Sequence, residues 1–177
     1  EADRLQLELQ EQVTKTRMVP VGPFFRQYGR TVRDVARARD KSVRLEIEGE
    51  DVEVDTRVVE RLRDPLTHMI RNAIDHGIEA KDERMRVGKP PVGTIALNAF
   101  QKGNHVVLEI EDDGKGMDPA DIAAFAIKRG LITEADAREM SVKEILNLVF
   151  QPGLTTRDDV TSLSGRGVGM DIVKTNI

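Results

Sequence analysis

The chain has 177 residues, of which 39% are hydrophobic and 33% are charged, with a net charge of −4 and no cysteine. This composition is typical of a globular protein with one core and a short appended element; it excludes disulfides and thiolate metal sites and disfavours nucleic acid as a partner. The absence of cysteine fits a cytoplasmic location, which we expect. The sequence shows neither a signal peptide nor an apolar run of about 18 residues that would span a membrane.

The first residues form an arm that precedes the domain. Leu5, Leu9 and Val13 recur at helical spacing among polar residues, which predicts a helix with a narrow apolar seam. The stretch from Met18 to Pro23 contains two prolines and a glycine and ends this periodicity. We therefore place the boundary between arm and domain so that residues 1–19 form the arm and residues 20–177 the domain.

The next apolar pattern predicts a helix with two different faces. Phe25, Tyr28 and Val32 recur on one face, which is expected to be buried. The opposite face carries a stripe of arginines, namely Arg26, Arg30, Arg33 and Arg37. Such a stripe is either a solvated face or a surface for phosphate or a partner.

Four segments show the patterns of β-strands. Residues 43–49 alternate strictly between apolar and polar side chains, and residues 52–54 form a second, shorter candidate. Residues 94–100 and 106–111 also have strand patterns, and the turn at residues 102–104 joins them into a hairpin.

Helix starts are marked by capping residues along the chain. Asp55 is a candidate N-cap, and Asp64-Pro65 predicts a restart, since Asp caps a helix and Pro fits its first position. Asp118-Pro119 repeats that signature for a helix that ends near Gly130, and Ser141 to Glu144 forms a capping box. The order of helix, strand, helix, hairpin and helices predicts an α+β fold rather than alternating βαβ units.

The predicted helix from Pro65 to Gly77 carries an unusual polar face. His68, Asn72, Asp75 and His76 fall within one arc, while apolar residues cover the other side. These residues form helix poorly but are rich in donors, acceptors and metal-capable groups. The face is therefore a candidate for chemistry; the alternative is a polar face that caps the helix end.

Two glycine-containing segments are further site candidates. Asp112 to Gly116 follow a strand, where a carboxylate can accept from an exocyclic amine and glycines let backbone approach a planar ring; an ordinary Asp-Gly turn is the alternative. Gly165 to Gly169 precede a predicted helix, whose N-terminal N–H groups favour phosphate. A plain flexible loop is the alternative for that segment.

Together these segments resemble the nucleotide-binding boxes of GHKL-type ATP-binding domains. Residues 68–77 resemble the N box, residues 112–116 the G1 box, residues 150–153 the F-box region and residues 165–169 the G2 box. Within that group the chain most resembles the catalytic domain of the CheA-type chemotaxis histidine kinases, at residues 64–66, 71–79, 88–91, 111–117 and 164–171. Residues 17–20 resemble the link between the dimerisation helices of these kinases and that domain.

The resemblance implies a fold and a domain organisation. The fold would be a two-layer α/β sandwich of the GHKL (Bergerat) type, with a mixed sheet, helices on one face and a short helical arm in front. Residues 1–19 would be the end of a dimerisation helix and a linker. Residues 20–177 would be the ATP-binding catalytic domain, apparently without the C-terminal strands of other family members.

The resemblance also assigns roles to residues of the boxes. Asn72 would hold a Mg²⁺ that bridges the ATP phosphates, because an amide oxygen is a hard neutral ligand. Asp112 would accept a hydrogen bond from the adenine amino group. The pocket and phosphate cradle would be formed by Gly114, Gly116, Gly165, Arg166, Gly167, Val168 and Gly169.

Four other side chains are expected at the nucleotide or the transferred group. His68 lies one turn before Asn72, where many relatives carry a Glu that activates a nucleophile, so its imidazole would accept a proton or orient the incoming group. Asp75 and His76 are expected at the nucleotide, although Asp75 can instead fix the tautomer of His68, and His76 can instead cap the helix. Lys128 would reach the phosphates or would only complement its helix dipole.

The implied reaction is transfer of the γ-phosphoryl group from ATP to a histidine of a separate phosphotransfer domain in two-component signalling, with ATP and Mg²⁺ as cofactors. The other implied partners, a coupling protein and a chemoreceptor, would bind regions outside this chain. The parent protein would be a homodimer and this chain a monomer. Two alternatives stay open, a nucleotide-binding regulatory scaffold without transferase activity and a GHKL ATPase.

Overall fold

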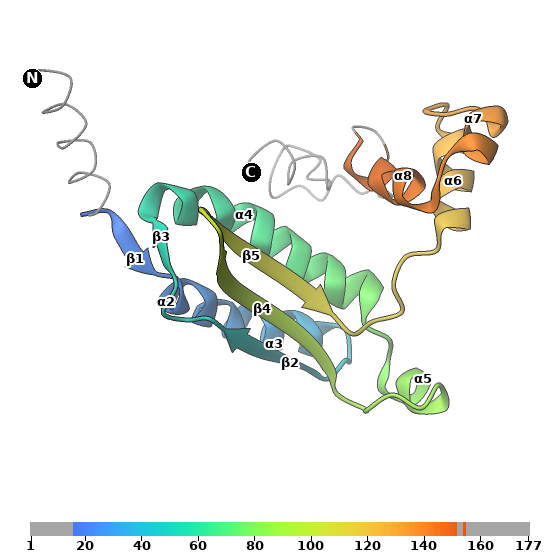
Figure 1. Cartoon of the computed structure of the whole chain (residues 1–177). Coiled ribbons are helices and arrows are strands. Elements are labelled where there is room, and N and C mark those ends of the chain that lie inside the picture. The colour runs from blue at the N-terminus through green and yellow to red at the C-terminus, as the bar shows by residue number, and fades with distance from the viewer. Residues whose placement is uncertain (1–15, 152–153, 155–177) are drawn as a thin grey trace, which may run out of the picture. The chain divides into compact units, whose positions relative to one another are not determined.

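The computed structural model describes residues 16–151 and residue 154. The chain divides into two compact units, residues 1–114 and residues 115–177 (Figure 1). The first unit contains all the strands that are described and the longest helix.

A mixed three-stranded sheet forms one layer of the first unit. Its strands are β2 (Val43–Glu48), β4 (Gly93–Lys102) and β5 (His105–Asp112), in the order β2-β4-β5. β2 runs parallel to β4, whereas β4 and β5 form the predicted antiparallel hairpin. Burial alternates along β2 and the first part of β4, so one face of the sheet is turned towards the core.

Helices form the second layer. α2 (Gly22–Arg26), α3 (Tyr28–Ala38) and α4 (Thr56–Asn72) lie on one face of the sheet (Figure 1). The core between the layers is aliphatic with a small aromatic group, and includes Phe25, Tyr28, Val32, Leu66, Ile70, Ile74, Ile95 and Leu97. The predicted α+β class, with a mixed sheet and helices on one face, is confirmed. The arginines of the opposite face of α2 and α3 are exposed, as expected for a solvated stripe.

The junction between arm and domain takes part in the fold. β1 (Met18–Pro20) pairs antiparallel with β3 (Glu53–Asp55), and Pro20 lies at the end of its strand, where a missing N–H is tolerated. Thr56 also donates its backbone N–H to the carbonyl of Arg17, at 3.1 Å. The predicted helical seam of residues 1–15 lies outside the described residues.

The predicted helix restart at Asp64-Pro65 is wrong. Asp55 is the N-cap and accepts from the Arg57 N–H at 2.8 Å, but α4 then continues through Pro65 without interruption. Pro65 is buried together with Leu62, Leu66 and Ile70 on the face that packs on the sheet. Burial of this apolar face outweighs the backbone hydrogen bond that proline removes.

The end of this helix differs from the regular α-helix that was predicted up to Gly77. From Ala73 to Gly77 the chain forms a π-helical turn, η1, in which the N–H of Ile78 donates to the carbonyl of Ala73 at 2.7 Å. The Lys41 ammonium donates to the carbonyls of Ile74 (2.5 Å) and Asp75 (3.2 Å) from outside the turn. These carbonyls therefore have a partner although the α-helical pattern is broken.

α5 (Lys81–Arg86) was not predicted. Its six residues are too few to show a periodic apolar face, and only its charges mark it. Asp82 and Glu83 occupy the first turn and Arg84 and Arg86 the last, which complements the helix dipole.

The second unit is helical in its described part. Its elements are α6 (Pro119–Lys128), α7 (Glu134–Glu139), α8 (Val142–Asn147) and the 3₁₀ turn η2 (Leu148–Phe150), and it has a small core of its own. That core is formed by Ala126, Leu148 and Leu154, with partly buried apolar neighbours. Across residues 16–151, no helix has both the length and the apolar character needed to cross a membrane.

The predicted caps of the second unit are confirmed, and one helix was missed. Asp118 accepts from the Ala120 N–H at 2.8 Å, and Ser141 and Glu144 form the capping box. α7 begins with a second capping box, formed by Thr133 and Asp136. α7 has no buried residue, so no apolar periodicity marks this helix in the sequence.

Candidate nucleotide-binding site

The end of η1 and the end of β5 meet backbone to backbone. A Cβ atom on Gly114 would overlap the carbonyl group of Gly77 and lie 2.7 Å from Oδ1 of Asp112. A Cβ atom on Gly77 would lie 3.0 Å from the same Asp112 oxygen. At Gly114 only glycine allows this approach, since the overlap is with backbone, whereas at Gly77 the nearest atom is the end of a side chain. The contact brings together two segments that are far apart in the sequence.

Asp112 is exposed at the end of β5, beside the end of the α4–η1 helix. Its Oδ1 accepts from the Gly114 N–H at 3.0 Å, which orients the carboxylate on its own turn. A carboxylate has about four acceptor positions, so capacity remains for an exocyclic amine. The geometry is thus compatible with the adenine-binding role that the sequence predicts.

His68 and Asn72 lie one turn apart on α4, and both are half-buried. Residues four apart on a helix share a face, so the two side chains project from the same side. Asn72 is the last residue of α4, directly before the π-helical turn. Single π-helical turns are frequent at functional sites, which fits the predicted role of this helix end.

Asp75 is held from α3. Arg39, at the C-cap of α3, donates Nε to Oδ1 of Asp75 at 2.7 Å and Nη2 to Oδ2 at 3.2 Å. The hydrogen bonds and negative charge of Asp75 raise the pKa of the Arg39 guanidinium. Asp75 therefore anchors η1 to α3, whereas His76, the next residue, is exposed.

The remaining predicted site residues belong to the second unit or lie outside the described residues. Gly116 and Lys128 belong to the second unit, where Gly116 has φ +73°, a conformation that favours glycine, and Lys128 is exposed at the end of α6. The predicted phosphate segment of Gly165, Arg166, Gly167, Val168 and Gly169 lies outside the described residues.

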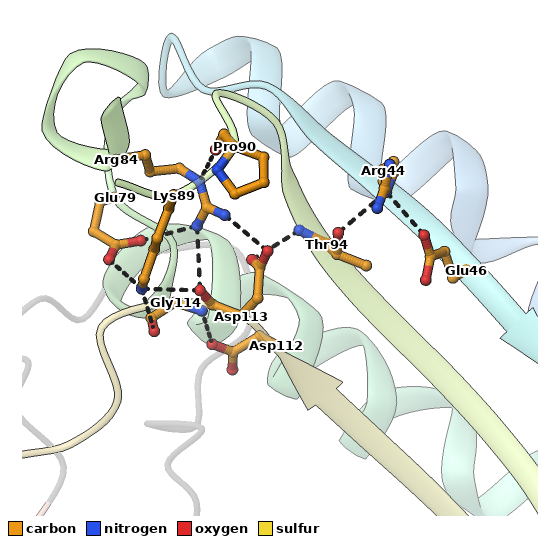
Figure 2. A network of polar contacts seen from close by, with 10 residues as sticks. All are labelled: Arg44, Glu46, Glu79, Arg84, Lys89, Pro90, Thr94, Asp112, Asp113 and Gly114. Carbon is orange, nitrogen blue, oxygen red and sulfur yellow. Dashed lines mark hydrogen bonds and ion pairs between the residues drawn. The ribbon is translucent and has the colours of Figure 1, made fainter. Parts of the chain in front are cut away.

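A partly buried ion cluster next to Asp112 could not be predicted from the sequence. We call it the Arg84 cluster, and it consists of Glu79, Arg84, Lys89 and Asp113 (Figure 2). The Arg84 side chain is 1% exposed and donates to Glu79 Oε2 (3.0 Å), Asp113 Oδ2 (2.7 Å) and the carbonyl of Pro90 (2.7 Å). Lys89 donates to Glu79 Oε1 at 2.6 Å. The only sign of it in the sequence was the acidic pair Asp112-Asp113 after a strand, because Arg84 and Lys89 lie more than twenty residues earlier in the chain.

Glu79 is ionised within this cluster. Burial opposes its charge, but the hydrogen bond from Lys89 and the positive charges of Lys89 and Arg84 outweigh burial and hold the pKa of the Glu79 carboxyl below its usual 4.5. A carboxyl group with a lowered pKa stabilises the folded state above its unfolded pKa, and that stabilisation is lost as the pH falls through the folded value.

We expect Glu79→Gln to reduce the acid sensitivity of the fold. At pH 7 the variant should lose about 1–3 kcal/mol of free energy of unfolding, because Lys89 and Arg84 lose a charged acceptor. Below pH 4.5 the difference from wild type should shrink as Glu79 becomes protonated in the wild type. Urea unfolding at a series of pH values measures this, with Glu109→Gln on the exposed side of β5 as the matched control. Parallel pH profiles for wild type and Glu79→Gln would contradict it.

The residues present suit ATP and one Mg²⁺. Among residues 16–151, no group of three or more His, Cys, Asp or Glu side chains could hold a metal ion. Mg²⁺ in nucleotide sites commonly takes one or two protein ligands and completes its shell with phosphate oxygens and water. The Asn72 amide oxygen, at the end of α4, is a donor of the required kind.

The sequence matches a known family. Residues 61–177 match the histidine kinase-, DNA gyrase B-, and HSP90-like ATPases. This match covers the helix with His68 and Asn72, the strand end with Asp112 and the glycine segment at residues 165–169. Together with the two-layer arrangement of helices on a mixed sheet, it places the chain in the class of ATP-binding domains of the GHKL type. The chain belongs to the histidine kinase-, DNA gyrase B-, and HSP90-like ATPase family.

Within this family the chain is similar to chemotaxis kinases. It is 52% identical over 170 residues to the sensor histidine kinase CheAY of Helicobacter pylori, covering 96% of this chain and 21% of that protein. It is 47% identical to the chemotaxis protein CheA of Treponema pallidum (98% of this chain, 21% of that protein) and 42% identical to CheA of Bacillus subtilis (98% and 26%). The resemblance to the CheA-type domain is confirmed, and the chain spans about a quarter or less of these relatives' length.

Proposed function

We propose that this chain is the ATP-binding catalytic domain of a CheA-type histidine kinase, and that it transfers the ATP γ-phosphoryl group to a histidine of a separate phosphotransfer domain. The observation that carries the proposal is the backbone contact between Gly77 and Gly114. It places the Asp112 carboxylate beside the end of the helix that carries His68 and Asn72. Similarity to CheA proteins over 96–98% of the chain supports the kinase assignment.

The residues of the first unit divide the proposed binding task between the two ends of the nucleotide. Asp112 accepts a hydrogen bond from the adenine amino group, and Gly77 and Gly114 let the backbone come close to the plane of the adenine ring. Asn72 offers its amide oxygen to Mg²⁺. When bound, Mg²⁺ neutralises charge on the phosphate oxygens. Gly116, Lys128 and residues 165–169 are proposed to complete the phosphate side, and Asp75 and His76 to contact the nucleotide.

The proposed reaction is an in-line phosphoryl transfer. An imidazole nitrogen of the acceptor histidine forms a bond to the γ-phosphorus while the bond from that phosphorus to the β,γ-bridging oxygen breaks, so that ADP leaves. Catalysis of this type depends on positioning and on charge stabilisation. His68, one turn before Asn72, is proposed to accept a proton or to orient the incoming imidazole.

The proposal includes the domain organisation and the partners. Residues 1–19 are assigned to the end of a dimerisation helix with its linker, and residues 20–177 to the catalytic domain. A coupling protein and a chemoreceptor would be engaged by regions outside this chain, and the location would be cytoplasmic. The parent protein would be a homodimer.

One experiment tests the activity. The chain is incubated with Mg²⁺ and γ-labelled ATP together with an isolated histidine-containing phosphotransfer domain, and acid-labile label on that domain is followed. Label on the domain supports the kinase. Binding of ATP without transfer would favour the regulatory scaffold instead, and release of free phosphate alone would favour the ATPase.

We expect His68→Ala to separate binding from transfer. Because His68 is proposed to act on the incoming group, its loss should slow transfer by about 10²–10⁴-fold, the usual range for a general acid or base, and leave the Kd for ATP nearly unchanged. ATP titration and single-turnover labelling measure the two quantities. The exposed His105, in the β4–β5 hairpin, is the matched control as His105→Ala. Equal losses of binding and transfer would mean that His68 is structural.

A further inference from the structure

We propose that the Arg84 cluster positions Asp112 and thereby sets the nucleobase selectivity of the site. The proposal rests on the proposed function, in which Asp112 recognises adenine. It adds positioning residues that touch neither the nucleobase nor the phosphates and that act through the backbone of the β5 end.

The cluster first holds the chain that follows Asp112. Lys89 Nζ donates to the carbonyls of Asp113 (3.1 Å) and Gly114 (2.9 Å). Arg84 donates to the same Asp113 carbonyl at 3.2 Å and to Oδ2 of its carboxylate at 2.7 Å. Oδ1 of Asp113 accepts from the Thr94 N–H, near the start of β4, at 2.8 Å. Asp113 and Gly114 therefore have little freedom to move relative to the sheet.

The same cations hold the chain that follows η1. Glu79 comes two residues after Gly77, and its carboxylate receives Arg84 Nη1 at 3.0 Å and Lys89 Nζ at 2.6 Å. Figure 2 shows both cations between Glu79 on one side and Asp113 with Gly114 on the other. The cluster thus joins the two segments whose glycine backbones touch, and it fixes how the Asp112 carboxylate lies beside the helix end.

The burial of the central pair, Arg84 and Glu79, is hard to explain by stability alone. The Arg84 side chain is 1% and the Glu79 side chain 5% exposed. Buried ion pairs lose much of their attraction to desolvation, and well-packed apolar side chains are often equally stabilising. Charge-assisted hydrogen bonds are directional, however, and they hold a neighbouring functional group within a narrow range of positions.

Nucleobase selectivity is the property that depends on that position. Adenine presents an amino group where guanine presents a carbonyl oxygen, and a carboxylate attracts the first and repels the second. A site that hydrogen-bonds a donor rejects analogues without it strongly, provided that the acceptor is in place. If Asp112 were displaced, the site would lose its selectivity for adenine over guanine, while its contacts to the phosphates would persist.

The test compares affinities of the 177-residue chain for ATP, GTP and inorganic triphosphate by calorimetry, in wild type and Lys89→Met. The Lys89 side chain is 32% exposed, so its replacement leaves no buried cavity. We expect Lys89→Met to reduce the ratio of Kd for GTP to Kd for ATP at least tenfold, with the Kd for triphosphate nearly unchanged. Arg84→Met should reduce the ratio further, and Arg86→Met, an exposed cation of the same helix, should not change it.

Three outcomes decide against the proposal or its basis. If folded Lys89→Met has the same ratio of Kd for GTP to Kd for ATP as the wild type, the positioning role is overturned. This holds even if Arg84→Met fails to fold. Equal losses of affinity for ATP and for inorganic triphosphate in Lys89→Met would overturn it too, because they would show a general structural effect. A wild-type chain that binds no ATP would overturn the proposed function itself, and the positioning role with it. Circular dichroism and thermal unfolding establish that each variant is folded.

Discussion

Replacing Asn72 by alanine will abolish Mg²⁺-dependent binding of ATP. Asn72 ends α4 at the start of the π-helical turn and offers the amide oxygen that is proposed to hold the metal. Metal coordination at a phosphate group contributes several kcal/mol, and each 1.4 kcal/mol is tenfold in affinity, so we expect a loss of about 100-fold or more. The rate of phosphoryl transfer should fall by at least the same factor.

ATP titrations with Mg²⁺ and with a chelator measure this effect. In the wild type the chelator should weaken binding strongly, whereas in Asn72→Ala it should change little. Asn104→Ala, in the exposed turn between β4 and β5, is the matched control. An Asn72→Ala variant with wild-type Mg²⁺ dependence would remove the metal assignment but not the adenine contact at Asp112.

Gly114→Ala should disrupt both the fold around the site and nucleotide binding. Its Cβ would overlap the Gly77 carbonyl, and both partners are backbone, so neither can rotate away. Forcing an extra group into a closely packed contact costs about 1–3 kcal/mol of free energy of unfolding. The separation of the β5 end from the helix end should also reduce ATP affinity by about 100-fold, because Asp112 no longer lies where the site requires it.

Two other glycines make this prediction specific. Gly77→Ala would place a Cβ 3.0 Å from Asp112 Oδ1, the end of a side chain that can turn, so it should weaken ATP binding with a smaller effect on unfolding. Gly29→Ala, in α3, meets nothing within 4 Å and should be neutral or stabilise by about 0.5–1 kcal/mol. Urea unfolding and ATP titration of the three variants should rank them accordingly. Equal effects of Gly114→Ala and Gly29→Ala would show that the glycine contact is not required.

Local sequence signals predicted most elements of the fold. The alternation of residues 43–49 and of the hairpin strands, and the caps at Asp55, Asp118 and Ser141, each depend on neighbours in the chain. Such signals fail where the apolar pattern is short, which is why α5 and α7 were missed. They also fail where tertiary burial opposes local preference, as at Pro65.

The candidate site was predictable in its residue types but not in its construction. The polar face of residues 68–76, the strand-end Asp112 and the glycines around it could be recognised by their chemistry and by resemblance to a family. The π-helical turn could not, because Lys41, in the connection between α3 and β2, stabilises it through the carbonyls of Ile74 and Asp75. Asp75 was likewise predicted as part of the polar face, but the structure shows that Arg39, at the end of α3, forms an ion pair with it.

The sequence by itself determined the class of fold, the family and the candidate residues for adenine and Mg²⁺. Only the tertiary structure showed that Gly77 and Gly114 touch and that Arg84 is buried between Glu79 and Asp113. The reason is physical. Caps and periodic patterns act over a few residues, whereas the contact of Gly77 with Gly114 and the pairing of Arg84 with Asp113 join residues more than twenty positions apart, which meet only when the chain has folded.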